Sequence, residues 1–200
     1  MRVAHASRDG APAAHGYPVR ARAMGTARSP VRARPDRPHR RPRGARRALA
    51  SRSVVAVVVL DDMGKRVSQG SGVALQPDAV ITNAHVLEQG VSIRVRSGKN
   101  SWPAILVSWD RDRDLALLKV AGASLEVAVK RPVATLVVGD PVYAIGAPLG
   151  LDLSLSSGLV SGLRVLKNGR TLIQTTAPIA PGSSGGGLFD GQARLVGSPR

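Results

Sequence analysis

Short apolar stretches recur along residues 53–197, and residues that form turns separate most of them. They are rich in valine and leucine, and they lack the spacing of three or four residues that would place apolar side chains on one face of a helix. This pattern is typical of β-strands. We therefore predict strands over residues 53–60, 71–76, 79–83, 91–96, 102–109, 115–120, 141–147, 153–166, 170–175, 187–190 and 193–197.

The order of the predicted strands indicates an all-β fold of two halves. A connecting stretch rich in valine and proline, residues 121–138, separates the first six strands from the last five. Many short strands with turns between them favour a sandwich or a pair of barrels. Because hydrophobic residues make up 43% of the chain and aromatic residues only 2%, the core must be built from aliphatic side chains.

The basic charge of the chain is concentrated at its N-terminal end. Residues 1–52 contain 14 arginines and 2 aspartates, and so carry +12 of the net charge of +16. This segment is rich in arginine, proline and alanine and has no apolar periodicity, so we expect a disordered tail over residues 1–52. A nucleic-acid-binding arm is the alternative. The near absence of aromatic residues for base stacking argues against nucleic acid as a partner.

The chain contains no cysteine, which excludes disulfides, thiolate metal sites and a cysteine nucleophile. No apolar region of the length that a signal peptide requires follows the charged start, so no signal peptide is recognisable. The apolar run at residues 54–60 is too short to span a bilayer, and we expect no membrane span. The compartment stays open on this evidence.

A single histidine, His85, occurs in residues 53–200, at the point where an apolar strand has just ended. A lone histidine is usually structural or simply exposed, so its neighbours decide its interpretation. Three acids occur later, in the turn between the predicted strands at residues 102–109 and 115–120. Asp110 and Asp112 alternate with arginines on an expected solvated loop, whereas Asp114 directly precedes an apolar strand and is the acid we expect to be partly buried.

The glycine-rich stretch PGSSGGGLF at residues 181–189 holds the candidate nucleophile, Ser184. Serine hydrolysis requires a hydroxyl, an imidazole that takes its proton, and a carboxylate that orients the imidazole. It also requires amides aimed at the oxyanion, and glycines let the backbone approach a substrate closely. A phosphate-binding loop is the alternative, but no lysine follows the glycines. His85, Asp114 and Ser184 occur in one of the known orders of such triads.

Four stretches of the chain resemble the protease domain of HtrA-type (Deg) serine endopeptidases, members of the chymotrypsin-like clan with a trypsin-like peptidase domain. They read GSGVALQPDAVITNAHVL, DRDLALLKV, VGDPVYAIGAPLGLDLSLSSGLVSGL and LIQTTAPIAPGSSGGGLFDGQARLVG. The resemblance covers roughly residues 53–197, and the motifs TNAHV, DLALLKV and GSSGG in this order form a specific combination.

The resemblance implies that His85 is the general base, Asp114 the orienting acid and Ser184 the nucleophile. The amides of Gly182 and Ser184 would form the oxyanion hole. It further implies hydrolysis of peptide bonds in unfolded or misfolded proteins through an acyl-enzyme, with no metal or organic cofactor. Polypeptide substrates, a homotrimer, and a place in the bacterial cell envelope or periplasm are also family expectations.

The fold implied by the resemblance is a pair of six-stranded Greek-key barrels, the first at residues 53–125 and the second at residues 126–200. Complete relatives continue with the closing strands of the second barrel. We therefore expect an incomplete second barrel and a C-terminally truncated product. Two alternatives to an active protease remain: an inactive fragment or pseudoprotease of the same fold that at most binds polypeptides, and nucleic-acid binding by the basic tail.

Overall fold

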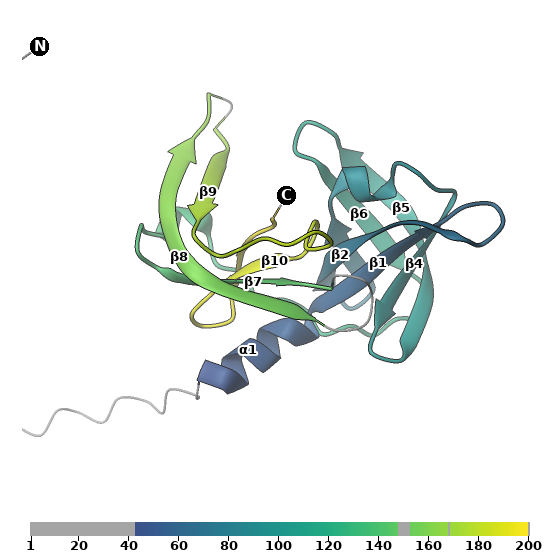
Figure 1. Cartoon of the computed structure of the whole chain (residues 1–200), viewed down its shortest axis with the longest axis horizontal. Helices are drawn as coiled ribbons and strands as arrows, with labels where there is room; N and C mark the ends of the chain where they lie inside the picture. The colour runs from purple at the N-terminus through teal and green to yellow at the C-terminus, as the bar shows by residue number, and fades with distance from the viewer. Residues whose placement is uncertain (1–42, 148–152, 168, 200) are drawn as a thin grey trace, which may run out of the picture. The chain divides into compact units, whose positions relative to one another are not determined.

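The structure, a computed structural model, describes residues 43–147, 153–167 and 169–199. These residues are built almost entirely from β-strands, which form two β-structures side by side (Figure 1). The elements are α1 (Arg43–Arg52), β1 (Val54–Leu60), β2 (Arg66–Gln76), β3 (Ala79–Thr82), η1 (Ala84–Leu87), β4 (Ser92–Ser97), β5 (Asn100–Asp110), β6 (Leu115–Val120), η2 (Val133–Thr135), β7 (Pro141–Gly146), β8 (Ser154–Val165), β9 (Thr171–Thr175), β10 (Gly187–Asp190) and β11 (Leu195–Gly197).

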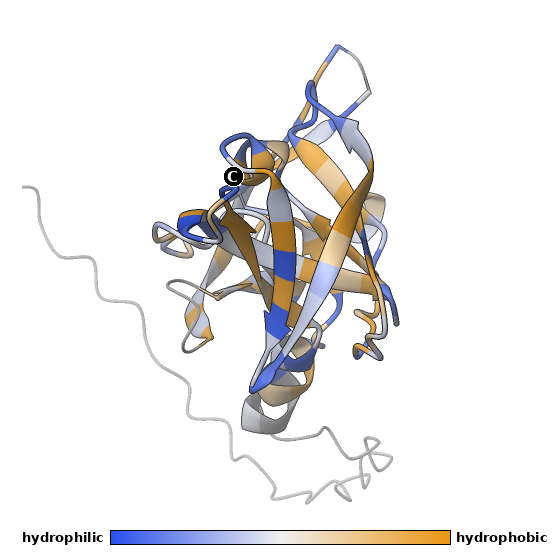
Figure 2. Ribbon diagram, turned by 90° about the vertical axis from the view of Figure 1, so that its right-hand side faces the viewer, coloured by the Kyte–Doolittle hydropathy of each residue, from blue (hydrophilic) through white to orange (hydrophobic). Residues whose placement is uncertain are grey.

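The first six strands close into a barrel in the order β1-β2-β3-β6-β5-β4. All neighbouring strands are antiparallel, and the pairing of β3 with β6 and of β1 with β4 gives the Greek-key connection that the family resemblance implies. Hydrophobic and hydrophilic bands alternate along the strands of this barrel (Figure 2). The interior is aliphatic, as the composition requires, and includes the fully buried Val57, Val80 and Leu118.

The remaining strands form a curled sheet in the order β11-β10-β7-β8-β9. Among the described residues this sheet does not close, so the predicted fold of one complete and one incomplete barrel is confirmed (Figure 1). Its inner face is lined by Val142, Val160 and Leu188. Each of the predicted strand stretches contains a strand of the structure, and most boundaries differ by one or two residues. The exception is β2, which begins at Arg66, five residues earlier than the predicted start at residue 71.

A third apolar cluster joins the two β-structures. Phe189 of β10 is fully buried in it and packs with Val54 of β1, Val73 of β2 and Ile145 of β7. This cluster explains why β1 is buried along almost its whole length: one face points into the barrel and the other toward the second sheet. A continuous valine run, with no polar alternation, is the expected sequence for such a strand.

Residues 43–52 differ from the expected tail, because they form helix α1. The segment combines alanine and arginine, which are both good helix formers. Tertiary contacts hold it in place: Ala50 is buried in the cluster around Phe189, and the Arg47 guanidinium lies 4.5 Å from the centre of the Tyr143 ring. The part of the expected tail at residues 1–42 lies outside the described residues.

A partly buried ion-pair network centred on Asp190 closes the turn between β10 and β11. The carboxylate of Asp190 is 3% exposed and accepts hydrogen bonds from the Arg194 and Arg131 guanidinium groups, at 2.7 and 3.3 Å for the shortest contacts. Arg131 also pairs with Asp140 at 3.0 Å. Burial by itself would raise the pKa of Asp190. The Arg194 guanidinium and the amides of Arg194 and Gln192 outweigh that effect and hold the pKa below its ordinary value.

The lowered pKa predicts that Asp190 stabilises the fold at neutral pH and that this contribution is lost on acidification. Because the unfolded chain takes up the proton first, the contribution is complete above the ordinary aspartate pKa of about 3.9 and declines as pH falls through the lower folded value. Asp190→Asn should lower the free energy of unfolding by about 2 kcal/mol at pH 7. Urea denaturation of both proteins from pH 7 to pH 3 should show the difference shrinking at the acid end. A difference that grows on acidification would contradict the prediction.

Candidate active site

His85 stands at the first turn after β3. The chain leaves the barrel at Thr82 and enters the short 3-10 helix η1, in which Ala84, Val86 and Leu87 are buried. These three apolar side chains anchor the turn in the barrel core, so the remaining position, His85, faces outward with 46% of its side chain exposed. The imidazole therefore faces solvent, because β3 and the buried apolar residues of η1 hold the turn in place.

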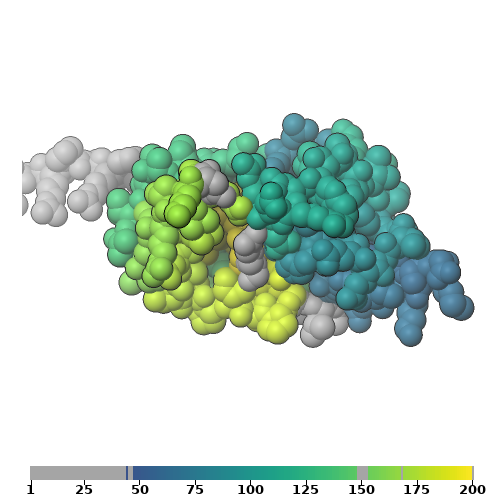
Figure 3. Space-filling model, turned by 90° about the horizontal axis from the view of Figure 1, so that it is seen from above, coloured from purple at the N-terminus to yellow at the C-terminus, as the bar shows by residue number. Residues whose placement is uncertain are grey.

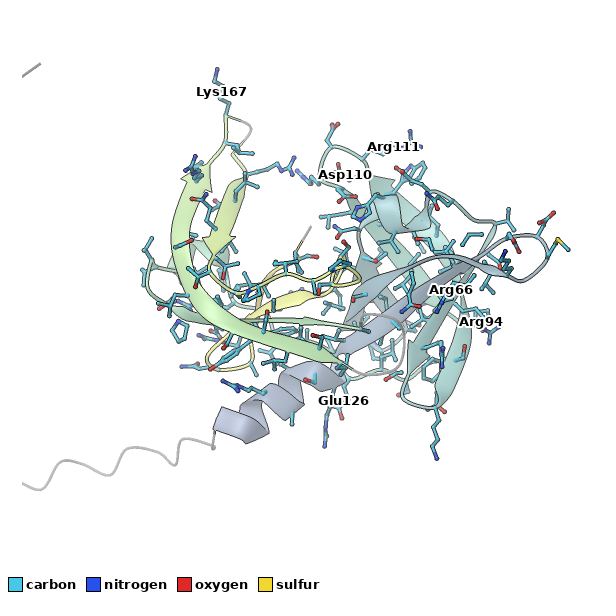
Figure 4. The ribbon with its side chains drawn as sticks, in the orientation of Figure 1. Arg66, Arg94, Asp110, Arg111, Glu126 and Lys167 are labelled. Atoms are coloured by element: carbon cyan, nitrogen blue, oxygen red, sulfur yellow. The ribbon has the colours of Figure 1, made fainter. Side chains whose placement is uncertain are left out.

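Asp114 contacts His85 at two points. Its Oδ2 lies 2.9 Å from His85 Nδ1, and its Oδ1 accepts the His85 backbone amide at 3.0 Å. Since a carboxylate can only accept, the Nδ1 atom must carry the proton, which leaves Nε2 as the basic nitrogen. The Asp114 side chain is 20% exposed, in line with the predicted partial burial. By contrast, Asp112 is exposed on the turn before β6. Asp110, which Figure 4 labels, is not on this turn as predicted but ends β5, where its carboxylate accepts the Arg113 amide at 2.9 Å.

Asn83 holds the backbone of Asp114 and was not identified by sequence reasoning. Its Nδ2 donates to the Asp114 carbonyl at 2.7 Å, and the residue is 1% exposed. Asp114 has a φ of +54°, a left-handed conformation that disfavours residues with a Cβ. The Asn83 hydrogen bond and the two contacts with His85 thus stabilise a backbone conformation that would otherwise be costly. The only signal in the sequence was the position of an asparagine two residues before the histidine.

The loop that carries Ser184 packs directly on the first barrel. Ser184 accepts the Ser71 amide of β2 at its carbonyl, with a distance of 2.8 Å. Gly185 has a φ of +81°, and a Cβ at this position would lie 2.2 Å from the Ser71 carbonyl and 2.4 Å from the Thr82 hydroxyl. Glycine is therefore required here for both conformation and space.

Gly70 places the His85 turn and the Ser184 loop next to one another. A Cβ on Gly70 would lie 2.7 Å from Val86 Cγ2 and 3.0 Å from the Ser184 carbonyl oxygen. Val86, the neighbour of His85, and the carbonyl of Ser184 thus lie close together beside Gly70. Neither His85 Nε2 nor Ser184 Oγ forms a hydrogen bond to another described residue, so both are available to an incoming group.

Two amides of the same loop have no protein acceptor within the described part of the chain. Ser183 donates to the Ala180 carbonyl at 3.0 Å and Gly186 donates to the Ser183 carbonyl at 2.9 Å, but the amides of Gly182 and Ser184 donate to no described group. These are the two amides that would form an oxyanion hole according to the family resemblance. Their lack of internal acceptors leaves them able to bind an external oxygen.

A groove with a volume of about 450 Å³ lies between the two β-structures; Asn83 lines it, whereas His85 and Ser184 do not. From the first barrel it is lined by Asn83, Arg113 and Leu115, and from the second sheet by residues of β9, β10 and β11 together with Ile179, Ser198 and Pro199. Figure 3 shows the recess between the first barrel and the β8–β9 hairpin. Arg170 crosses it, because its Nη1 donates to the Asp112 carbonyl at 2.9 Å. In Figure 4, Lys167 lies at the tip of the β8–β9 hairpin and Arg111 on the turn between β5 and β6.

No group of three or more histidine and acidic side chains that could hold a metal ion occurs within residues 43–147, 153–167 and 169–199. No helix in this part of the chain is both long enough and apolar enough to cross a membrane.

Comparison with protein families identifies a trypsin-like peptidase domain over residues 70–197. The chain belongs to this family. The match includes His85, Asp114 and Ser184, as well as most of both β-structures of the trypsin-like domain described above.

Curated relatives confirm the resemblance to HtrA-type serine endopeptidases. The chain is similar to the protein named Protease Do-like 1, chloroplastic, of Arabidopsis thaliana, with 37% identity over 66% of this chain and 33% of that protein. A probable periplasmic serine endoprotease DegP-like of Pseudomonas savastanoi pv. phaseolicola is 41% identical over 65% of this chain and 28% of its own length. The Serine protease PepD of Mycobacterium tuberculosis is 33% identical over 78% of this chain and 39% of its own length. The chain thus spans about a third of the length of these relatives.

The close packing at Gly185 predicts that a single methyl group there disrupts the loop. Gly185→Ala adds a Cβ that overlaps the Ser71 carbonyl, so the free energy of unfolding should fall by more than the cost of a left-handed alanine, which is about 1–2 kcal/mol. Gly122→Ala is the matched control: Gly122 has a φ of +74°, and a Cβ there would meet no atom within 4 Å. Urea denaturation should show a clearly larger loss for Gly185→Ala. Equal losses in the free energy of unfolding would contradict the prediction, because they would mean that the loop accommodates the methyl group without strain.

Proposed function

We propose that this protein is a serine endopeptidase in which Ser184 attacks the peptide bond, His85 transfers the proton and Asp114 orients the imidazole. The observation that carries the proposal is the contact of Asp114 with both the ring and the amide of His85, in a turn whose Val86 lies next to the Ser184 loop at Gly70. Membership of the trypsin-like peptidase family and the relatives named serine endoproteases support it.

The reaction begins when His85 Nε2 accepts the proton of the Ser184 hydroxyl as Oγ attacks the carbonyl carbon. The positive imidazolium that results is stabilised by the Asp114 carboxylate, 2.9 Å from Nδ1. The negative charge that develops on the substrate oxygen is placed against the unpaired amides of Gly182 and Ser184. His85 then donates its proton to the leaving amine. A water molecule, activated by the same imidazole, hydrolyses the acyl-enzyme and regenerates Ser184.

The apolar part of the groove lining supports a substrate with aliphatic side chains. Leu115, Ile173, Leu188 and Val196 contribute apolar surface along the groove. Folded proteins bury such side chains, whereas unfolded or misfolded proteins expose them. We infer that unfolded or misfolded polypeptides are the substrates, in agreement with the resemblance, and that a homotrimer is the assembly to test first.

The nucleophile assignment predicts covalent labelling at one residue. A fluorophosphonate should label the full chain, and Ser184→Ala should abolish both labelling and hydrolysis of an unfolded substrate such as reduced, alkylated lactalbumin. Ser183→Ala provides the matched control, because Ser183 is adjacent and buried and has no catalytic role in the proposal. Mass spectrometry of the labelled peptide identifies the site. A folded wild-type protein that is neither labelled nor active would favour the alternative, a non-catalytic protein of the same fold.

The orientation of His85 predicts a large effect of a single isosteric change. Asp114→Asn replaces the acceptor with an amide that can donate to Nδ1, which stabilises the wrong tautomer and should reduce kcat about 10⁴-fold. Asp112→Asn, on the exposed part of the same turn, makes the same change in charge and should leave kcat unchanged. Steady-state hydrolysis of a peptide substrate measures both. Similar kcat values for the two variants would exclude Asp114 as the orienting acid.

A further inference from the structure

Ser71 is a fully buried polar residue at the boundary between the barrel and the Ser184 loop. It lies in β2, where it pairs with Ala56, and has an exposure of 0%. Its carbonyl accepts the Thr82 hydroxyl at 2.6 Å, and its amide donates to the Ser184 carbonyl. These backbone contacts need no particular side chain at position 71. The hydroxyl group therefore requires a separate explanation.

The Ser71 hydroxyl connects two backbone groups of the second β-structure. Its Oγ donates to the Gly182 carbonyl at 2.6 Å and accepts the Ala147 amide at 2.8 Å. A hydroxyl has one hydrogen, so the bond to the Gly182 carbonyl uses the only hydrogen that Ser71 Oγ can donate. In a buried environment, such linked hydrogen bonds strengthen one another.

The Gly182 carbonyl is the group whose direction matters for the candidate oxyanion hole. It belongs to the peptide between Gly182 and Ser183, and the other end of this peptide, the Ser183 amide, donates to Ala180. Ser71 and Ala180 thus hold this peptide plane at both ends. The amides of Gly182 and Ser184 belong to the peptide planes on either side of it, so a rotation of the held peptide would turn them apart.

The space around the hydroxyl leaves little freedom for an alternative arrangement. A Cβ on Gly146 would lie 3.0 Å from Ser71 Oγ and 2.8 Å from Ser183 Cα, so the backbone of β7 is packed against both. Removal of the hydroxyl would leave the Gly182 carbonyl and the Ala147 amide without their buried partner. A rotation of the Ser184 loop that gave these two groups new hydrogen-bond partners would then lower the free energy.

We propose that Ser71 is a positioning residue, whose hydroxyl orients the peptide between Gly182 and Ser183 and thereby aims the amides of Gly182 and Ser184 at one point. This role rests on the proposed function, because the two amides matter for catalysis only if Ser184 is the nucleophile. Ser71 itself does not touch the substrate or the reacting atoms.

The test compares Ser71→Ala with Ser53→Ala in the full chain. Ser53 is the matched control, since it is 3% exposed and its hydroxyl donates to the Ala50 carbonyl at 2.9 Å, outside the Ser184 loop. Both variants lose a buried hydrogen bond from serine to a backbone carbonyl. Only Ser71→Ala should reduce kcat, by about 10- to 100-fold, with little change in KM and in the shape of the pH profile. A kcat equal to that of Ser53→Ala would overturn the proposal.

Hydrogen–deuterium exchange separates this proposal from the proposed function. In Ser71→Ala, but not in Ser53→Ala, the amides of Ser183 and Gly186 should exchange faster than in the wild type, because their hydrogen bonds depend on the loop conformation. This holds whether or not the wild type hydrolyses peptides. If the wild type is inactive but Ser71→Ala shows this exchange pattern, only the protease assignment is refuted. If exchange in Ser71→Ala equals that in the wild type, the role of Ser71 is refuted. If Ser71→Ala does not fold, Ser71→Cys, which fills the site with a weaker donor, is measured in the same way.

Discussion

The contact between the edge of the first barrel and the Ser184 loop is the constraint on which the rest of the structure depends. The imidazole and its carboxylate belong to the first barrel, whereas the candidate nucleophile belongs to the second β-structure. They can act together only if the two β-structures meet in one defined arrangement. The Ser71 amide and hydroxyl bind the loop at two carbonyls, and Gly185 lets the loop approach without a side chain. Apolar packing around Phe189 joins the same two parts but is not directional.

Polar groups within the first barrel prepare the imidazole before any substrate is present. Asp114 adopts a left-handed conformation, and the Asn83 amide and the His85 backbone and ring compensate for it. One oxygen of the Asp114 carboxylate contacts the His85 ring, and the other accepts the His85 backbone amide. This arrangement determines the tautomer of His85 and directs the free nitrogen away from the barrel. The site is organised by hydrogen bonds to the backbone as much as by the contact between the His85 and Asp114 side chains.

The sequence was most informative where local pattern and tertiary structure agree. Unbroken valine runs and recurrent turn residues predicted the strands, because both faces of β1 and the inner faces of its neighbours are buried. Helix α1 was missed because arginine and alanine alone show no apolar stripe, and Ala50 and Arg47 find their partners only in the folded protein. Asn83 and Ser71 were also missed, since an asparagine before a turn and a serine between two glycines are equally typical of ordinary loops.

The sequence by itself determined the all-β architecture, the identity of the only histidine in residues 53–200 and the glycine-rich loop around Ser184. Apolar periodicity and residue chemistry are local properties, so these conclusions needed no coordinates. Tertiary structure alone decided which aspartate reaches His85 and which buried polar groups hold the loop. Those contacts join residues 29 and 111 positions apart. Hydrogen bonds act over about 3 Å, so only the packing of the two β-structures can select their partners.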